Sequence, residues 1–178
     1  MKSGFTTFRY LGTGRTTGVS GQCEDSDLKR FLWNYYNRVE SSLVFTESAA
    51  NSWSYTTPTW RQANANSAAK VEVVIGLVED TIDLTVLSSV FSASAAPYAL
   101  IGIGEDTTSA PHADCHREGG GYIASVWLNF ASYLTTYPSS IGYHYYAWLE
   151  YASASTITFF AGIDAVPYRA GLSGTHFC

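Results

Sequence analysis

The fold that we expect for this chain follows from one stretch, YHYYAWLEYASASTITFFA, which runs from Tyr143 to Ala161. Large side chains alternate along its first half with a period of two, which predicts a β-strand. The small residues 152–155 predict a turn, and the β-branched and aromatic residues after them predict a returning strand, so we expect a β-hairpin. One face of the first strand carries Tyr143, Tyr145, Ala147, Leu149 and Tyr151, and the other carries His144, Tyr146, Trp148 and Glu150.

Neither face of the strand at 143–151 is plainly polar. A strand of this kind is usually covered on both sides. We expect a second sheet over one face, and another subunit or a rim loop over the other. We therefore predict that Tyr146 and Trp148 lie at a subunit interface, since a contiguous apolar patch usually marks one.

Alternating segments recur along the rest of the chain, with turn signals about 8–12 residues apart. The segments are Ser42–Thr46, Asn51–Thr57, Lys70–Val78, Tyr98–Gly104, Tyr122–Phe130 and Gly171–Phe177. Around a turn at Glu79 and Asp80 we predict a core of Val71, Val73, Ile75, Leu77, Ile82, Leu84 and Val86. Strands and helices do not alternate as in a parallel sheet. The pattern predicts an all-β fold, an antiparallel and jelly-roll-like β-sandwich.

Residues 1–40 differ from the rest of the chain. Their first part is rich in Gly, Thr and Ser and forms an extended N-terminal arm, which carries the large apolar residues Phe5, Phe8, Tyr10 and Leu11. These four side chains cover either this chain's own sandwich or a partner, and we expect a partner. Apolar residues then recur at helical spacing in Asp25–Asn37, which predicts one short helix. We expect two parts: an attachment arm with its helix at 1–40 and a β-sandwich domain at 41–178.

The composition narrows the class of protein. Aromatic residues make up 15% of the chain and charged residues only 14%, with a net charge of -5. We expect no nucleic-acid partner, because such proteins carry a basic face. No apolar run is long enough to span a membrane, and the first residues do not resemble a secretory leader. The three cysteines, Cys23, Cys115 and Cys178, are an odd number, which predicts free thiols made in a reducing cytoplasm.

The sequence contains few residues in patterns that suggest a metal site or an active site. Residues of metal-ligand type cluster only at His112, Cys115 and His116, and zinc needs three or four converging ligands. His144, His176 or Cys178 would complete such a site only through the fold or across a subunit axis. We expect an ordinary polar loop, no metal and no cofactor, although the sequence alone leaves a metal site open.

Carboxylates stand at the predicted strand ends, at Glu79, Asp80, Glu105, Asp106 and Glu118. A pair of them would suit a glycosidase, but solvated turns are the commoner role. We find no nucleophile elbow and no phosphate-binding loop. We predict no catalytic residues and no enzymatic activity.

Several motifs in combination resemble a group of small virion proteins of tailed bacteriophages. They are Tyr36–Val39, Asn51–Thr57, Thr59–Asn64, Val73–Asp80, Ile101–Ser109 and Ile141–Glu150. The resemblance covers about Tyr36 to the C-terminus and leaves out the arm. It concerns structural motifs and carries over no catalytic residue.

The resemblance implies a non-enzymatic structural protein of the virion, assembled in the host cytoplasm. It would join a capsid or tail protein through its N-terminal arm, and a capsid decoration or head fibre is preferred to a tail fibre. Closed symmetry would hide the apolar patch predicted above, and the resemblance to phage knobs suggests a homotrimer. The alternative is a receptor-binding or carbohydrate-binding module at a fibre tip, with a host surface glycan as partner.

Overall fold

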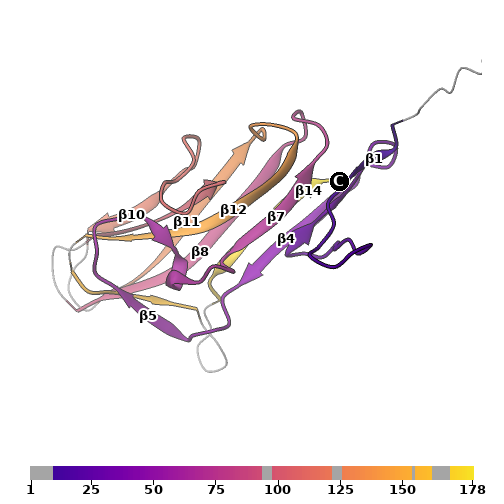
Figure 1. Cartoon of the computed structure of the whole chain (residues 1–178). Helices are drawn as coiled ribbons and strands as arrows, with labels where there is room; N and C mark the ends of the chain where they lie inside the picture. Colours follow the sequence, from indigo (N-terminus) through magenta and orange to yellow (C-terminus); the bar gives the residue numbers. More distant parts are fainter. Residues whose placement is uncertain (1–9, 94–97, 122–125, 154, 162–168) are drawn as a thin grey trace, which may run out of the picture.

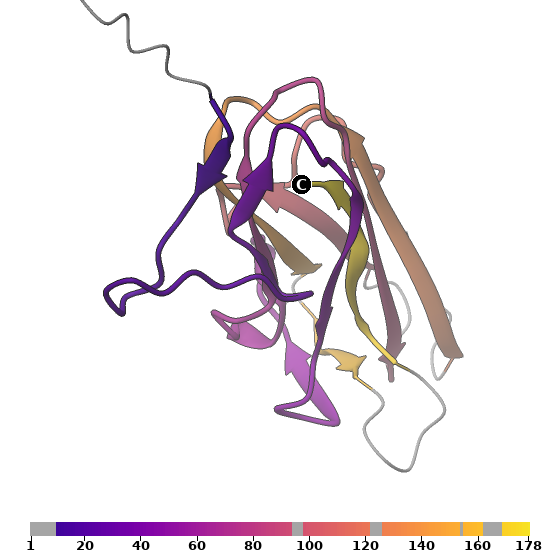
Figure 2. The same ribbon diagram turned by 90° about the vertical axis from the view of Figure 1, so that its right-hand side faces the viewer.

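The computed structural model describes residues 10–93, 98–121, 126–153, 155–161 and 169–178. Two six-stranded sheets pack face to face, and a separate two-stranded sheet lies beside them (Figures 1 and 2). Within the described residues every strand pairing is antiparallel except that of β2 with β7. The predicted antiparallel β-sandwich is therefore confirmed.

The first sheet has the order β10-β9-β12-β7-β2, and β6 also pairs with β12. Its strands are β2 (Lys29–Arg30), β6 (Arg61–Gln62), β7 (Lys70–Ile75), β9 (Tyr98–Glu105), β10 (Glu118–Gly121) and β12 (Gly142–Ala152). The second sheet has the order β4-β14-β8-β13-β5, and β11 also pairs with β8. Its strands are β4 (Glu40–Thr46), β5 (Ser52–Tyr55), β8 (Ile82–Ser92), β11 (Val126–Thr136), β13 (Ile157–Phe160) and β14 (Gly171–Phe177).

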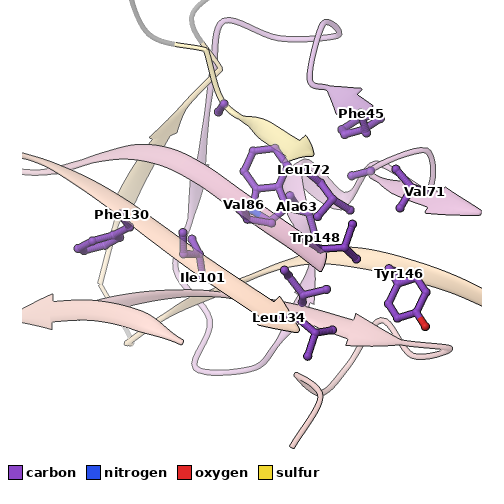
Figure 3. Close-up of a cluster of buried hydrophobic side chains, with 14 of the residues drawn as sticks. Phe45, Ala63, Val71, Val86, Ile101, Phe130, Leu134, Tyr146, Trp148 and Leu172 are labelled. Carbon is purple, nitrogen blue, oxygen red and sulfur yellow. The ribbon is translucent and has the colours of Figure 1, made fainter. Parts of the chain in front are cut away.

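The core fills the space between the two sheets (Figure 3). Six of the predicted core residues are at most 2% exposed, namely Val71, Val73, Ile75, Ile82, Leu84 and Val86. The seventh, Leu77, is half-buried and packs in a smaller cluster with Phe31, Trp33 and Val74. The three cysteines are free, as predicted.

The hairpin predicted at 143–161 does not form. Strand β12 belongs to the first sheet and β13 to the second, so the chain crosses the sandwich between them. Strand periodicity is the same for a hairpin and for a crossover, because it reports only which face a side chain takes. Similar crossovers join β7 to β8 and β8 to β9, which suits the jelly-roll-like arrangement that we expected.

The faces of β12 are also the reverse of our prediction. Tyr146 and Trp148 point into the sandwich and are 0% exposed, so the prediction that they form a subunit interface is wrong. The opposite face is covered in part by a loop: a Cβ atom added to Gly104 would lie 2.6 Å from the Thr107 carbonyl oxygen and 3.0 Å from Leu149 Cδ1. A second sheet covers one face of this strand, and a rim loop covers part of the other.

The helix predicted at 25–37 is wrong as well. This segment forms β2 and β3 (Leu32–Asn34), and β3 pairs with β1 (Gly12–Gly14) in the two-stranded sheet. Phe31 and Trp33 are buried while Leu32 between them is exposed, which is the period of a strand. A single turn of 3-10 helix at Ala63–Ala65 is the one helical element among the described residues.

Candidate interaction sites

The sheet of β1 and β3 carries a surface rich in exposed apolar side chains. We call this the N-terminal surface, and it consists of Tyr10, Leu11, Leu32, Tyr35, Tyr36 and Val39, which are 48–67% exposed. A shallow groove of about 630 Å³ runs over it, lined by residues 11–14, 32–34 and 36. Within the described residues β1 pairs with no strand other than β3, so one edge of this small sheet is available to a further strand.

The base of the N-terminal surface is fixed to the sandwich. Trp33 is 2% exposed and lies flat over Gly76, where an added Cβ atom would fall 2.0 Å from the indole ring. The Trp33 indole N–H donates to Asp80 Oδ2 at 3.1 Å, and Arg38 donates to Asp80 Oδ1 at 2.5 Å. The segment is therefore held at one side and exposed at the other, outside the two sheets (Figure 2).

Two of the four residues predicted to bind a partner through the arm lie in the described part of the structure. Tyr10 and Leu11 are 51% and 67% exposed and belong to the N-terminal surface. The Tyr10 ring packs on Trp33 and on Tyr35, with ring centroids 6.2 and 6.0 Å apart. Phe5 and Phe8 lie outside the described residues.

A row of aromatic side chains crosses the first sheet. The rings of Trp60 and Tyr151 have centroids 5.5 Å apart, and those of Tyr151 and Tyr98 are stacked at 5.8 Å. A hydrogen bond with Tyr98 raises the pKa of Tyr151, so the two hydroxyl groups adjoin. The end of the Trp60 ring approaches Gly102, where an added Cβ atom would lie 3.5 Å away. The three rings pack on one another, and Tyr98 at the end of the row is 43% exposed.

A third group of rings lies on the second sheet. Trp127, which is 46% exposed, has its ring centroid 4.2 Å from that of Phe160 and 5.6 Å from that of Phe91. Strand pairing brings them together, because Trp127 is the register partner of Phe91 and Phe160 that of Ser89, the second residue before Phe91. The three rings form an aromatic patch on this sheet.

The predicted metal-ligand types at His112, Cys115 and His116 do not converge. Cys115 is buried, and its sulfur accepts a hydrogen bond from the Ile103 amide at 3.2 Å. The His116 ring stacks on Tyr133 with centroids 4.5 Å apart. The His112 side chain contacts Glu105 instead, with its Nε2 atom 3.3 Å from Glu105 Oε2.

The other candidate ligands and acids also lie apart. Cys178 Sγ donates to Ser41 Oγ at 3.0 Å. His176 is fully buried, neither ring nitrogen has a hydrogen-bond partner, and burial lowers its pKa to about 4. Glu79 is exposed, Asp80 is occupied by Trp33 and Arg38, and the side chain of Glu118 lies outside the described part of the structure. Glu105 and Asp106 instead meet His144.

Sequence reasoning missed a buried ionic network around Glu150, which is 0% exposed. Its carboxylate accepts hydrogen bonds from Trp53 Nε1 at 2.6 Å, from Arg61 Nε at 2.7 Å and from the Asn64 amide at 3.2 Å. Burial raises the pKa of Glu150 to about 7, although these donors oppose the shift. The network joins β5 of the second sheet to β12 of the first. A glutamate inside an apolar strand was the available signal, but its partners are 86–97 residues away.

Neither the protein-family models nor the curated proteins with which the sequence was compared match this chain. Within the described residues no helix has the length and apolar character that crossing a membrane requires.

Proposed function

We propose that this chain is a non-enzymatic structural protein of a tailed-bacteriophage virion, which attaches to a capsid or tail protein through its N-terminal segment. The sandwich would project from the particle, as a capsid decoration or head fibre in preference to a tail fibre. The class comes from the resemblance of motifs such as Asn51–Thr57 and Ile141–Glu150 to small virion proteins.

The observation that carries the attachment is the N-terminal surface. Its apolar side chains lie in β3, at Leu32, and in the segments that flank β1 and β3. They adjoin a groove and a sheet edge that is available to another strand. Contiguous exposed apolar side chains usually mark an interaction site, and a partner strand can pair with an exposed sheet edge. Residues 1–9 precede this surface directly, so Phe5 and Phe8 would extend the same contact.

The test is incorporation into particles assembled in infected cells. We expect the double substitution Leu11→Asp and Leu32→Asp to leave a folded protein that particles no longer incorporate, because the charges face a partner's apolar surface. Ile141→Asp is the matched control, since it places the same charge on a sandwich side chain that is 67% exposed, as Leu11 is. Normal incorporation of the double variant, or equal loss in the control, would contradict attachment through this segment.

We also propose that the protein assembles as a homotrimer. Tyr146 and Trp148 are buried and cannot provide the interface, so the contact moves to the patch of Phe91, Trp127 and Phe160. Interfaces are enriched in such aromatic side chains. Light scattering tests this: the wild type should have three times the mass of the chain, and Trp127→Asp should lower it. A monomer at micromolar concentration would contradict the trimer.

The row of Trp60, Tyr151 and Tyr98 favours a second candidate function, a carbohydrate-binding module. In this case Trp60→Ala and Tyr151→Ala should abolish glycan binding and leave incorporation unchanged. The Leu11 and Leu32 variant should do the reverse, so the two functions are separable in one set of proteins. If the wild type binds no glycan on an array of bacterial surface polysaccharides, the module is contradicted.

A further inference from the structure

Two acidic residues and a histidine meet at one end of the sandwich. Glu105 is the last residue of β9, Asp106 follows it, and His144 comes from the adjacent strand β12. His144 Nδ1 lies 2.7 Å from Asp106 Oδ2 and 3.5 Å from Glu105 Oε1. The side chains of Glu105 and His144 are each 5% exposed. One potential ligand atom from each of the three residues falls within 4.8 Å of the other two.

The other ring nitrogen of His144 is already occupied. Its Nε2 lies 2.9 Å from the Ser140 carbonyl oxygen, which can only accept, so Nε2 carries a hydrogen. Histidines that bind metals usually donate their second N–H to a backbone carbonyl or carboxylate in this way, which directs the first nitrogen at the ion. The Ser140 carbonyl therefore directs Nδ1 at the two carboxylates.

Both carboxylates are held in place by backbone amides. Glu105 Oε1 accepts from the Ser139 amide at 3.0 Å, and Asp106 Oδ1 accepts from the Tyr145 amide at 3.0 Å. Each keeps a second oxygen, Oε2 in Glu105 and Oδ2 in Asp106. His112 Nε2 lies 3.3 Å from that Glu105 Oε2 and can orient it. Such supporting contacts are typical of the surroundings of metal ligands.

A buried hydroxyl group without a protein partner lies on the same strand face as His144. Tyr146 is 0% exposed, yet its hydroxyl group has no hydrogen-bond partner. Tyr146 shares its face of β12 with His144 and is the register partner of Glu105. Its hydroxyl points away from the rest of the core side chains drawn in Figure 3. Burial raises the pKa of Tyr146, and the charges of Glu105 and Asp106 raise it further. Buried hydroxyl groups nearly always find a partner, and this one is available to a group held by the three residues.

We propose that Glu105, Asp106 and His144 bind one divalent transition-metal ion of the zinc class, and that a water molecule on the ion meets the Tyr146 hydroxyl. Imidazole nitrogen together with few oxygen ligands suits Zn²⁺, whereas Ca²⁺ and Mg²⁺ take six or more oxygens. In this structure His144 Nδ1 and Asp106 Oδ2 lie at hydrogen-bond distance, 2.7 Å apart. A bound ion would replace this hydrogen bond and release its proton to solvent, and the two ligand atoms would separate to about 3.3 Å, the edge of a zinc tetrahedron.

The bound ion would tie the end of β9 to β12 and to the loop that carries Ser140. It uses His112 as a supporting residue rather than a ligand. Of the cluster that the sequence offered at 112–116, only His112 is near this site.

The test is metal titration of the purified, chelator-treated full chain by calorimetry. We expect one Zn²⁺ per chain and at least tenfold weaker binding in His144→Gln and in Glu105→Gln, with no heat from Ca²⁺ or Mg²⁺. His116→Gln is the matched control and should bind as the wild type does. Absence of zinc binding, unchanged binding in both ligand variants, or equal loss in the control would overturn the proposal.

Cobalt keeps the test decisive even if the ligand variants do not fold. The wild type with Co²⁺ should show the intense visible absorption of a four-coordinate site, and its absence would overturn the proposal by itself. Tyr146→Phe removes only the unpartnered hydroxyl group and should shift these bands, because the bound water loses its hydrogen bond. An unchanged spectrum in Tyr146→Phe would overturn the role of that water.

Discussion

Residues 10–39 and the sandwich of residues 40–178 use large side chains in opposite ways. In β12 of the sandwich, Tyr146 and Trp148 are completely buried, whereas Leu11 and Tyr36 of the N-terminal surface are 67% and 51% exposed. Among the described residues, seven exposed large apolar side chains lie in residues 10–39 and ten in the much longer remainder. Scattered exposed side chains are normal, but a cluster indicates an interaction site. The sandwich buries its large side chains in its own core, whereas the N-terminal segment leaves a cluster of them exposed.

We expect the largest change in the free energy of unfolding from a buried tryptophan, and a much smaller change from an exposed one. Trp148→Ala should lower the free energy of unfolding by about 3–5 kcal/mol, because it removes a fully buried ring from the core. Trp127→Ala, on the sheet surface, should cost only about 1 kcal/mol when wild type and variant are compared at a protein concentration that keeps both monomeric. Urea denaturation of both variants measures the difference, and equal losses would mean that Trp148 does not belong to the core.

We expect the next largest change in unfolding free energy from a substitution in the ionic network around Glu150. Arg61→Ala should cost about 3 kcal/mol, since it leaves the buried Glu150 carboxylate without its charged partner. The raised pKa of Glu150 means that its carboxyl group can protonate, so part of this loss should return as the pH falls below 7. Lys70→Ala breaks the more exposed pair with Glu72 and should cost under about 1 kcal/mol. A similar cost for both substitutions would contradict the difference in burial.

A third prediction concerns the buried His176. Its pKa is lowered to about 4 in the folded protein and is about 6.5 in the unfolded chain, so the unfolded state binds more protons between these values. Stability contributed by this residue is present above pH 6.5 and is lost as the pH falls towards 4, by up to about 3 kcal/mol.

Glu150 acts in the opposite direction, because its raised pKa favours the folded state at lower pH. The measurement must therefore compare wild type with His176→Leu, which keeps Glu150. The difference in unfolding free energy between the two proteins should be constant above pH 7 and should change by up to about 3 kcal/mol between pH 6.5 and 4. A constant difference down to pH 4 would show that His176 is not a buried neutral side chain.

The strands of the sandwich could be predicted from the sequence because alternation reports directly on a half-buried sheet. Val71, Val73 and Ile75 are examples, since all three are fully buried, and Val71 and Val86 are seen in the core in Figure 3. Alternation did not show which face of β12 is buried. That face carries His144 and Glu150, whose burial depends on partners distant in sequence, such as Asp106 and Arg61.

The helix prediction for residues 25–37 was wrong for a different reason. Leu28, Phe31, Leu32 and Tyr35 fit a helical stripe, but Phe31 and Trp33 also fit a strand. Tertiary packing decides between them, since Trp33 packs on Gly76 and β2 pairs with β7. The metal site proposed above was invisible for a similar reason, because 38 residues separate Asp106 from His144 in sequence.

The smallest effect on stability should come from the N-terminal surface. Leu11→Asp and Leu32→Asp should each change the free energy of unfolding by less than about 0.5 kcal/mol, because both side chains are already exposed. Urea denaturation checks this, with Trp148→Ala as the reference for a large loss. A loss of several kcal/mol would mean that the segment is part of the core.

Hydrogen exchange tests attachment through the N-terminal segment most directly. In the free protein, amides of β1 and β3 should exchange much faster than those of β12, because the two-stranded sheet is held only at its base. In particles that carry the protein, amides of β1 and β3 should become strongly protected, while β12 stays as it was. Exchange in β1 and β3 that is the same in free and particle-bound protein would contradict the account.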